Sequence, residues 1–257
     1  MKTIIESLQN DKIKHLNRLA TDNRFRKKQG VFIVEGVQEN QRALTFGNEA
    51  LEFYICESIF SAELPTNAKT YYITDKIYQK IAYRGTTEGI IGIYKTPQNH
   101  LDHFIPSENA SVIIVESIEK PGNLGAILRS CEAFGIEALI VTDPRVDFYN
   151  PNVIRSSVGC LFGMNIFQAD NQSTLAFLKK HHFKVYTTFM SEDAQLIHQK
   201  DFKTKTALIF GTEHSGISDF WKGKAENILV PMAGTIDSLN LSNAVAVSCY
   251  EILRQRL

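Results

Sequence analysis

The chain has 257 residues, 44% hydrophobic and 22% charged, a composition typical of a globular protein and not of a disordered one. Its 28 lysines and arginines balance 28 aspartates and glutamates, which excludes a global basic field, so any nucleic-acid binding must use local patches. The four cysteines lack the paired spacing of a zinc or redox site, and no apolar segment is long enough for a signal peptide or a membrane span. We therefore expect a cytoplasmic protein with no metal and no membrane partner.

The first 104 residues are expected to form a small α/β domain. Basic side chains concentrate in residues 1–30, ahead of an apolar run, which predicts a helical segment leading into a strand. These basic residues are typical of a solvated helix face, and equally of an RNA-binding surface if the domain binds RNA. Alternating apolar residues predict strands at 31–34, 51–56, 70–74 and 89–94, and a helix at about 36–46.

Residues 105–257 are expected to form a second, larger domain. Turn-forming residues at 96–109 mark the connection, with the boundary near residue 105. Beyond it, short β-rich runs alternate with helical patterns, which indicates a mostly parallel sheet with helices on both faces. The predicted strands are residues 111–115, 138–141, 184–188, 206–210 and 227–230. Ligands of such sheets bind beyond the carboxyl ends of the strands, so the loops leaving the strands are candidate sites.

The first such loop contains Asn123 and Arg129. Asn123 is predicted to be the N-cap of a helix that stops at Gly135. Apolar residues at helical spacing would form a buried stripe, with Arg129 on another face. Because helix N-termini favour anions, a phosphodiester could bind here. The alternative is that Arg129 is a solvated charge and Asn123 only a cap.

The second loop, Gly211 to Gly216, directly follows an apolar strand and places Glu213 between two glycines. Glycines allow a ligand to approach the backbone, and the carboxylate could orient a sugar hydroxyl. A simple tight turn would look the same.

The third loop leads from Val230 into a closing helix expected at 243–256. Ser238, Asn240 and Ser242 cannot all cap this helix, so at least one is available for another task, unless the loop merely has redundant turn residues. The small apolar residues at the start of the helix suit close packing against a second helix.

Together the three loops resemble the three signature motifs of the SpoU (TrmH) family of RNA ribose 2'-O-methyltransferases, a branch of the SPOUT superfamily. Residues 123–129 are similar to Asn-x-Gly-Ala-Ile-x-Arg, and residues 211–216 to Gly-x-Glu-x-x-Gly. Residues 231–242 are similar to Pro-Met-x-Gly-x-x-x-Ser-Leu-Asn-x-Ser. Residues 32–36 and 89–91 resemble the family's N-terminal substrate-binding domain, which is similar to ribosomal protein L30e.

The resemblance implies S-adenosylmethionine as the methyl donor and RNA as the acceptor, with no metal. The cofactor would be held around Gly211, Val230, Met232, Leu239 and Leu241. Arg129 would face the target ribose, and the residues that arrange it would be Asn123, Glu213, Ser238 and Asn240. A deep trefoil knot near the C-terminus and a homodimer with the active site at the subunit interface are also implied. Because a guanidinium rarely gives up its proton, we expect Arg129 to bind phosphate and stabilise alkoxide charge rather than act as a base.

Two features favour ribosomal RNA over tRNA as the substrate. Glu88 stands where many relatives have glutamine, and the chain ends soon after the closing helix, without the extension of some tRNA-modifying relatives. The alternatives are methylation of tRNA and a non-catalytic RNA-binding role in ribosome assembly. A nucleotide-binding oxidoreductase would also show strand–helix alternation, but the three-glycine dinucleotide fingerprint is missing.

Overall fold

The computed structural model describes residues 4–63, 67–82, 88–189, 191, 194–212 and 216–257. Two compact units make up the chain, the first comprising Met1–Gln98 with Asp147–Gly163 and the second Asn99–Val146 with Met164–Leu257. The sequence predicted one division at residues 104/105 and did not predict that a later segment joins the N-terminal unit. Within the described ranges, no helix combines the length and the apolar character needed to cross a membrane.

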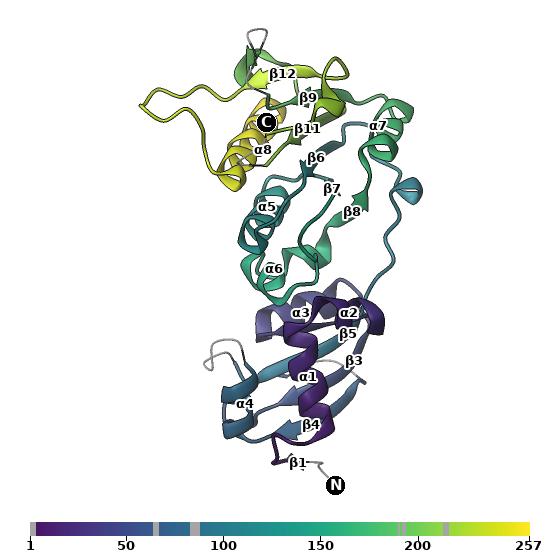
Figure 1. Cartoon of the computed structure of the whole chain (residues 1–257), viewed down its shortest axis with the longest axis vertical. Helices are drawn as coiled ribbons and strands as arrows, with labels where there is room; N and C mark the ends of the chain where they lie inside the picture. Colours follow the sequence, from purple (N-terminus) through teal and green to yellow (C-terminus); the bar gives the residue numbers. More distant parts are fainter. Residues whose placement is uncertain (1–3, 64–66, 83–87, 190, 192–193, 213–215) are drawn as a thin grey trace. The chain divides into compact units, whose positions relative to one another are not determined.

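The N-terminal unit is built on a mixed sheet in the order β1-β4-β3-β5-β2, seen from purple to blue in Figure 1. Its strands are β1 (Ile4–Ile5), β2 (Val31–Glu35), β3 (Ala50–Ile55), β4 (Lys69–Ile73) and β5 (Ile90–Lys95). Its helices are α1 (Asp11–Thr21), α2 (Asn23–Gln29), α3 (Val37–Thr45), α4 (Asp75–Ile81), α6 (Pro151–Ser156) and the 3-10 turn η2 (Cys160–Gly163). The four predicted strands and the predicted helix correspond to β2 to β5 and α3, whereas β1 and α4 were not predicted.

Apolar residues of α1 and α4 cover one face of this sheet. Leu16 and Leu19 of α1 and Ile77 of α4 are buried in one cluster with strand residues. At the start of α3, the backbone N–H of Val37 donates to the carboxylate of Glu88. Glu88 therefore has a local capping role, which a glutamine oxygen could also fill.

A buried ion pair ties the segment Asp147–Gly163 to the rest of this unit. Arg26 is only 3% exposed and donates from Nε and Nη2 to Oδ2 of Asp147, at 3.0 and 2.9 Å. The ring of Phe32 stacks on that of Tyr149, with centroids 4.5 Å apart. Arg26 was expected to belong to a basic surface. That expectation is wrong for this residue, because its guanidinium is enclosed and paired.

The C-terminal unit contains a parallel sheet in the order β10-β12-β9-β11-β6-β7-β8. Its strands are β6 (Ser111–Glu116), β7 (Ala138–Thr142), β8 (Asn165–Ala169), β9 (Lys184–Thr187), β10 (Gln195–Leu196), β11 (Thr206–Phe210) and β12 (Glu226–Leu229). Its helices are α5 (Pro121–Ala133), α7 (Asn171–Lys180) and α8 (Leu241–Arg256), with 3-10 turns η1 (Leu101–His103), η3 (Ile197–Gln199) and η4 (Asp219–Trp221). In Figure 1, α5 and α8 lie on one side of the sheet and α7 on the other. The predicted parallel sheet with helices on both faces is confirmed.

The central strands β6, β7 and β11 are buried along their whole length. Their alternate residues, such as Ile114 and Ile140, pack with Leu178 of α7 and with Trp221. Continuous apolar strands of this kind are typical of a parallel sheet that is covered on both faces.

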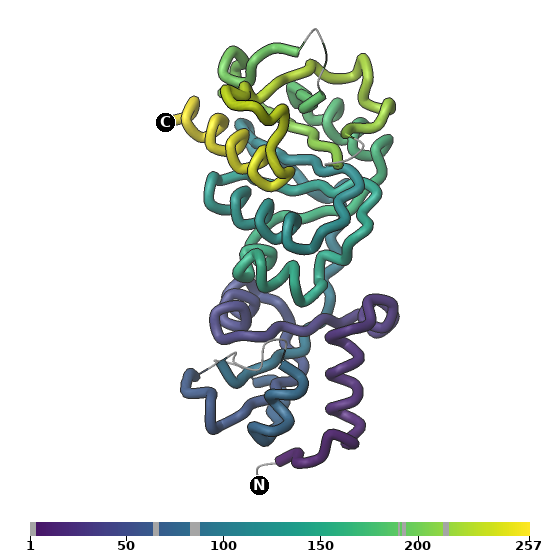
Figure 2. The backbone as a smooth tube through the Cα atoms, turned by 60° about the vertical axis from the view of Figure 1, so that its left-hand side comes forward, coloured from purple at the N-terminus to yellow at the C-terminus, as the bar shows by residue number. Residues whose placement is uncertain are grey.

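Helices α5 and α8 pack side by side, as Figure 2 also shows. The rings of Phe134 and Tyr250 meet edge to face with centroids 5.9 Å apart. Burial and a hydrogen bond to Cys249 raise the pKa of the Cys131 thiol well above its ordinary value, so this thiol stays protonated. The expected packing of the closing helix against a second helix is confirmed.

Candidate functional site

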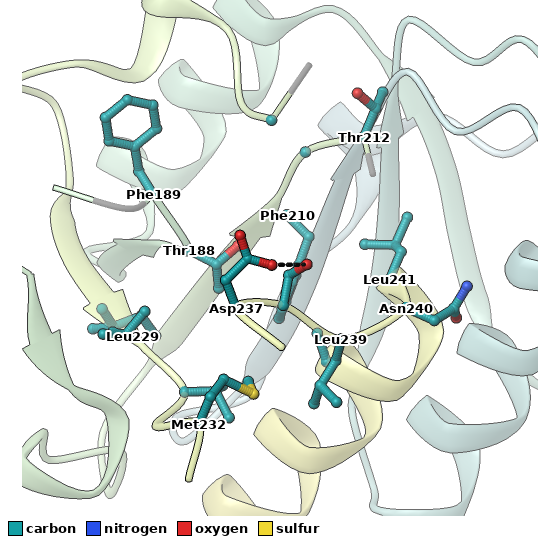
Figure 3. Close-up of a pocket in the computed structure, with 16 residues that line it drawn as sticks. Thr188, Phe189, Phe210, Thr212, Leu229, Met232, Asp237, Leu239, Asn240 and Leu241 are labelled. Carbon is teal, nitrogen blue, oxygen red and sulfur yellow. Dashed lines mark hydrogen bonds between the residues drawn. The ribbon is translucent and has the colours of Figure 1, made fainter. Parts of the chain in front are cut away.

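A cavity of about 600 Å³ opens at the carboxyl ends of β9, β11 and β12. Figure 3 shows Leu229 of β12, Leu239 of the third loop and Leu241 of α8 around it. Its volume and its largely apolar walls are those of a small-molecule site, and its position is the one expected for an open parallel sheet.

Most of the residues singled out in the second and third loops meet at this cavity. The residues assigned to the cofactor all line it: Gly211, Val230, Met232, Leu239 and Leu241. Ser238 and Asn240, assigned to the acceptor side, line it as well. Glu213 lies outside the described residues.

Sequence reasoning gave no role to several polar or aromatic residues of the wall, including Thr188, Phe189 and Asp237. Thr188 and Phe189 follow β9, and Asp237 precedes Ser238 in the third loop. Ligands of parallel sheets bind beyond the carboxyl ends of the strands, and this applies to β9 as well, so Thr188 and Phe189 could have been predicted from their position. The carboxylate of Asp237 accepts a hydrogen bond from the Ser238 hydroxyl at 3.3 Å, drawn as a dashed line in Figure 3.

The backbone of the second loop is closed at its base. The N–H of Thr212 donates to the carbonyl of Gly216 at 3.0 Å, and the N–H of Gly216 donates back to the carbonyl of Thr212 at 3.1 Å. A Cβ atom on Gly211 would lie 2.0 Å from the carbonyl carbon and oxygen of Gly216. Glycine is therefore required at position 211 by the loop itself, before any ligand is considered.

The carboxylate of Glu116, the last residue of β6, is anchored to the end of this loop. Glu116 is 5% exposed and accepts from the backbone N–H of Ser218 at 2.7 Å and from the Ser218 hydroxyl at 2.6 Å. The side-chain amide of Asn171 donates to the same carboxylate at 2.5 Å. The sequence suggested no role for Glu116, because a polar residue at the end of an apolar strand is common.

Asn240 is the N-cap of α8. Its side-chain oxygen accepts from the backbone N–H of Ser242 at 3.0 Å and from the Ser242 hydroxyl at 2.7 Å. Of the three residues that competed for the cap, Asn240 therefore takes it, and the helix begins at Leu241 rather than at residue 243.

Asn123 lines a second, smaller cavity of about 110 Å³, which shares Thr212 and Leu241 with the larger one. The predicted N-cap role of Asn123 is wrong, because α5 begins at Pro121 with Lys120 in the cap position. Proline has the backbone angle of a first helical residue and lacks the N–H that would need a cap. The expected end of the helix is confirmed, since Gly135 follows it with a φ of +69°.

Arg129 is exposed on α5 and lines neither of these two cavities. Its side chain has no ion pair or hydrogen bond with any residue that the structure describes. Two residues later on the same helix, the Cys131 thiol is hydrogen bonded to Cys249 of α8.

The described residues contain no group of three or more histidine, cysteine, aspartate or glutamate side chains placed to hold a metal ion. The polar groups gathered at the two cavities are hydroxyls, amides, the carboxylates of Asp237 and Glu119, and the ammonium group of Lys120. This set can bind a polar organic ligand and position a hydroxyl group.

Comparison with known proteins relates both halves of the chain to enzymes that methylate RNA. A model of the SpoU rRNA Methylase family matches residues 110–250, and a model of the MRM3-like substrate binding domain matches residues 10–92. The chain is 27% identical over 252 residues to the 23S rRNA (guanosine(2553)-2'-O)-methyltransferase RlmP of Bacillus subtilis (strain 168), which covers 96% of this chain and 98% of that protein.

Solved structures agree. A crystal structure of an RNA 2'-O ribose methyltransferase is 32% identical, with a TM-score of 0.86 and 99% of each chain covered. The SpoU methyltransferase AviRb from Streptomyces viridochromogenes, in complex with AdoMet, shares the fold at 23% identity, with a TM-score of 0.86 over 96% of this chain and 98% of that chain. The protein therefore belongs to the SpoU rRNA methylase family.

Proposed function

We propose that this protein transfers a methyl group from S-adenosylmethionine to a ribose 2'-hydroxyl of ribosomal RNA. The observation that carries the proposal is the cavity of about 600 Å³ at the strand ends, lined by residues of the second and third family motifs. Its relative RlmP, which matches nearly the whole chain, is named for action on 23S rRNA and supports ribosomal RNA over tRNA.

The cavity has the chemistry that this cofactor needs. Apolar side chains such as Leu239 and Leu241 would offer a surface for the adenine ring, and the backbone of Gly211 and Val230, which also line the cavity, would hold it by hydrogen bonds. The Asp237 carboxylate supplies negative charge for a cationic ligand. Met232 would be among the residues that hold the cofactor, which when bound would supply a methyl group activated by a sulfonium.

The acceptor side is assigned to residues around the smaller cavity and α5. Because a guanidinium is a donor and not a base, Arg129 is assigned to bind the phosphate of the target nucleotide and to stabilise the negative charge that develops on the 2'-oxygen. Preorganised charge of this kind contributes about 3–4 kcal/mol to the transition state. Asn123, Glu213, Ser238 and Asn240 orient the ribose.

We further propose a homodimer with the active site at the subunit interface. Val247 and Tyr250 are 44% and 53% exposed on α8, which packs against α5, the helix that carries Arg129. A second subunit that covers this apolar strip would also bring its own surface to Arg129. The remaining proposals are a deep trefoil knot near the C-terminus, an L30e-like RNA-binding domain in residues 1–104, a catalytic domain in residues 105–257, and a cytoplasmic location.

The test is transfer of labelled methyl groups from S-adenosylmethionine to total ribosomal RNA and, separately, to total tRNA from a strain that lacks the protein. Nuclease digestion then identifies 2'-O-methylated nucleosides. Label in ribosomal RNA is the expected result. Label in tRNA alone would overturn the choice of substrate, and no label together with no cofactor binding would favour the non-catalytic alternative.

A further inference from the structure

We propose that Glu116 is a positioning residue that holds the second-motif turn, where Thr212 pairs with Gly216, in the geometry that binds the methyl donor. This inference rests on the proposed function, because it concerns the same cofactor cavity. Glu116 itself does not line that cavity.

The sheet places Glu116 beside the start of the turn. Strands β6 and β11 are parallel neighbours, with Val115 opposite Phe210, so Glu116 and Gly211 extend from the two strands at the same level. The turn then leaves β11, closes through Thr212 and Gly216, and reaches Ser218, which returns to the Glu116 carboxylate. Both ends of the turn are thereby tied to the carboxyl edge of the central strands.

The Glu116 carboxylate accepts three short hydrogen bonds. One carboxylate oxygen accepts from the Ser218 backbone N–H, and the other accepts from the Ser218 hydroxyl and the Asn171 amide, all at 2.7 Å or less. Hydrogen bonds to an ionised acceptor are about twice as strong as neutral ones. All three partners donate in this arrangement, and the carboxylate satisfies them together because both of its oxygens accept.

A glutamine at this position tests the contact without changing the side chain's shape. In one orientation, the NH₂ group of this glutamine faces the Ser218 backbone N–H and leaves that donor without an acceptor. In the other, it faces the Ser218 hydroxyl, which can accept instead, and the Asn171 amide, which loses its acceptor as it is placed here. In both orientations the remaining hydrogen bonds lose the negative charge of their acceptor and become weaker. The turn would then relax away from β6 and carry Thr212 and Gly216 out of the cavity wall.

The chain offers a matched control at the opposite edge of the same sheet. Glu137, immediately before β7, accepts from the backbone N–H of Ser107 at 2.8 Å and from the Ser107 hydroxyl. As with Glu116, one carboxylate accepts from the backbone N–H and from the hydroxyl of a single serine, but here at the amino end of the strands. Glu137 lines neither of the two cavities described above. Glu137→Gln therefore weakens the same kind of hydrogen-bond pair at a more exposed position away from the cofactor.

The experiment measures the Kd of S-adenosylmethionine by isothermal titration calorimetry, and the Tm, for the wild-type protein and for Glu116→Gln, Ser218→Ala, their double variant and Glu137→Gln. We expect Glu116→Gln to raise the Kd roughly 5- to 150-fold. The Kd of the double variant should not exceed the higher Kd of the two single variants, because both changes break the same contact between Glu116 and Ser218. In turnover assays, the KM for the cofactor should rise while the KM for RNA stays unchanged, and Glu137→Gln should alter neither.

An unchanged Kd in folded Glu116→Gln, or fully additive effects in the double variant, would overturn the inference. If Glu116→Gln does not fold, Ser218→Ala takes its place as the test, since it removes only the hydrogen bond from the hydroxyl. A raised Kd for Ser218→Ala supports the inference, and an unchanged Kd overturns it. A wild-type protein that binds no S-adenosylmethionine would instead refute the proposed function, and this inference with it.

Discussion

Replacing Gly211 by alanine should weaken cofactor binding through the backbone of the second-motif turn. The added Cβ would lie 2.0 Å from the carbonyl carbon and oxygen of Gly216 and 2.3 Å from the nitrogen of Ile217. Real Cβ atoms essentially never approach other atoms closer than 3.0 Å. Since the obstructing atoms are backbone, no side-chain rotation can relieve the overlap. The turn itself must open.

The size of the effect follows from that displacement. Forcing an extra methyl group into a packed site costs about 1–3 kcal/mol. Because Thr212 and Gly216 belong to the cavity wall, a turn that has relaxed must be restored before the ligand binds. At about 1.4 kcal/mol per factor of ten, the Kd should rise roughly 5- to 150-fold.

Titration calorimetry with S-adenosylmethionine measures this change, with the Tm recorded in parallel. Gly122→Ala on α5 is the control, because a Cβ atom there meets nothing within 4 Å. We expect its Kd to match that of the wild type. If Gly211→Ala bound the cofactor within twofold of the wild type at an unchanged Tm, the closed turn could not be what shapes the cavity.

Four further predictions concern stability, turnover, pH and RNA binding. Asp147→Ala leaves its arginine partner buried without a counter-charge and should lower the free energy of unfolding in urea by about 3–5 kcal/mol, whereas a loss below about 1 kcal/mol would contradict the buried pair. Arg129→Lys keeps the charge but loses the planar fork, so kcat should fall roughly 100-fold or more with cofactor affinity unchanged; near-normal turnover would refute its role. A hydrogen bond from Arg254 lowers the pKa of Glu251. The stabilisation that the Glu251 carboxylate provides is therefore complete above the ordinary pKa of about 4.3 and is lost as the pH falls through the lowered value. Between about pH 5 and pH 3, the Tm of Glu251→Gln should drop less than the Tm of the wild-type protein. Reversing the exposed charges of Lys27 and Lys28 should make the salt dependence of RNA affinity shallower by up to about two in slope, and an unchanged slope would exclude them from the RNA contact.

The central part of the fold was predictable because burial on both faces leaves continuous apolar runs in the sequence. Strands β6, β7 and β11 were predicted for this reason, and their loops led to the site. The strand β8 was missed because it lies at the sheet edge, where only Ile166 and Phe167 of its five residues are buried. Two-residue strands such as β1 and β10 carry no pattern at all.

Contacts between distant parts of the chain were beyond sequence reasoning. The ion pair of Arg26 with Asp147 joins residues 121 positions apart, and neither residue has a local signal for burial. Asn123 was misassigned for a different reason. Asparagine is a favoured cap, but Pro121 two residues earlier already meets the requirements of a first helical turn, and that local preference decided where the helix begins.

The motif residues that point to chemistry also shape their own loops. Gly211 allows the second turn to close, and Asn240 caps α8. A site built at strand ends produces this overlap, because loop backbone without regular pairing needs nearby side chains to satisfy it, and these are the polar groups that also meet a ligand. Glu116 is the opposite case. It lies outside the three motifs quoted above, yet its contact with Ser218 holds the same wall of the cavity. A motif therefore locates a site of this kind, whereas the geometry identifies what holds it in place.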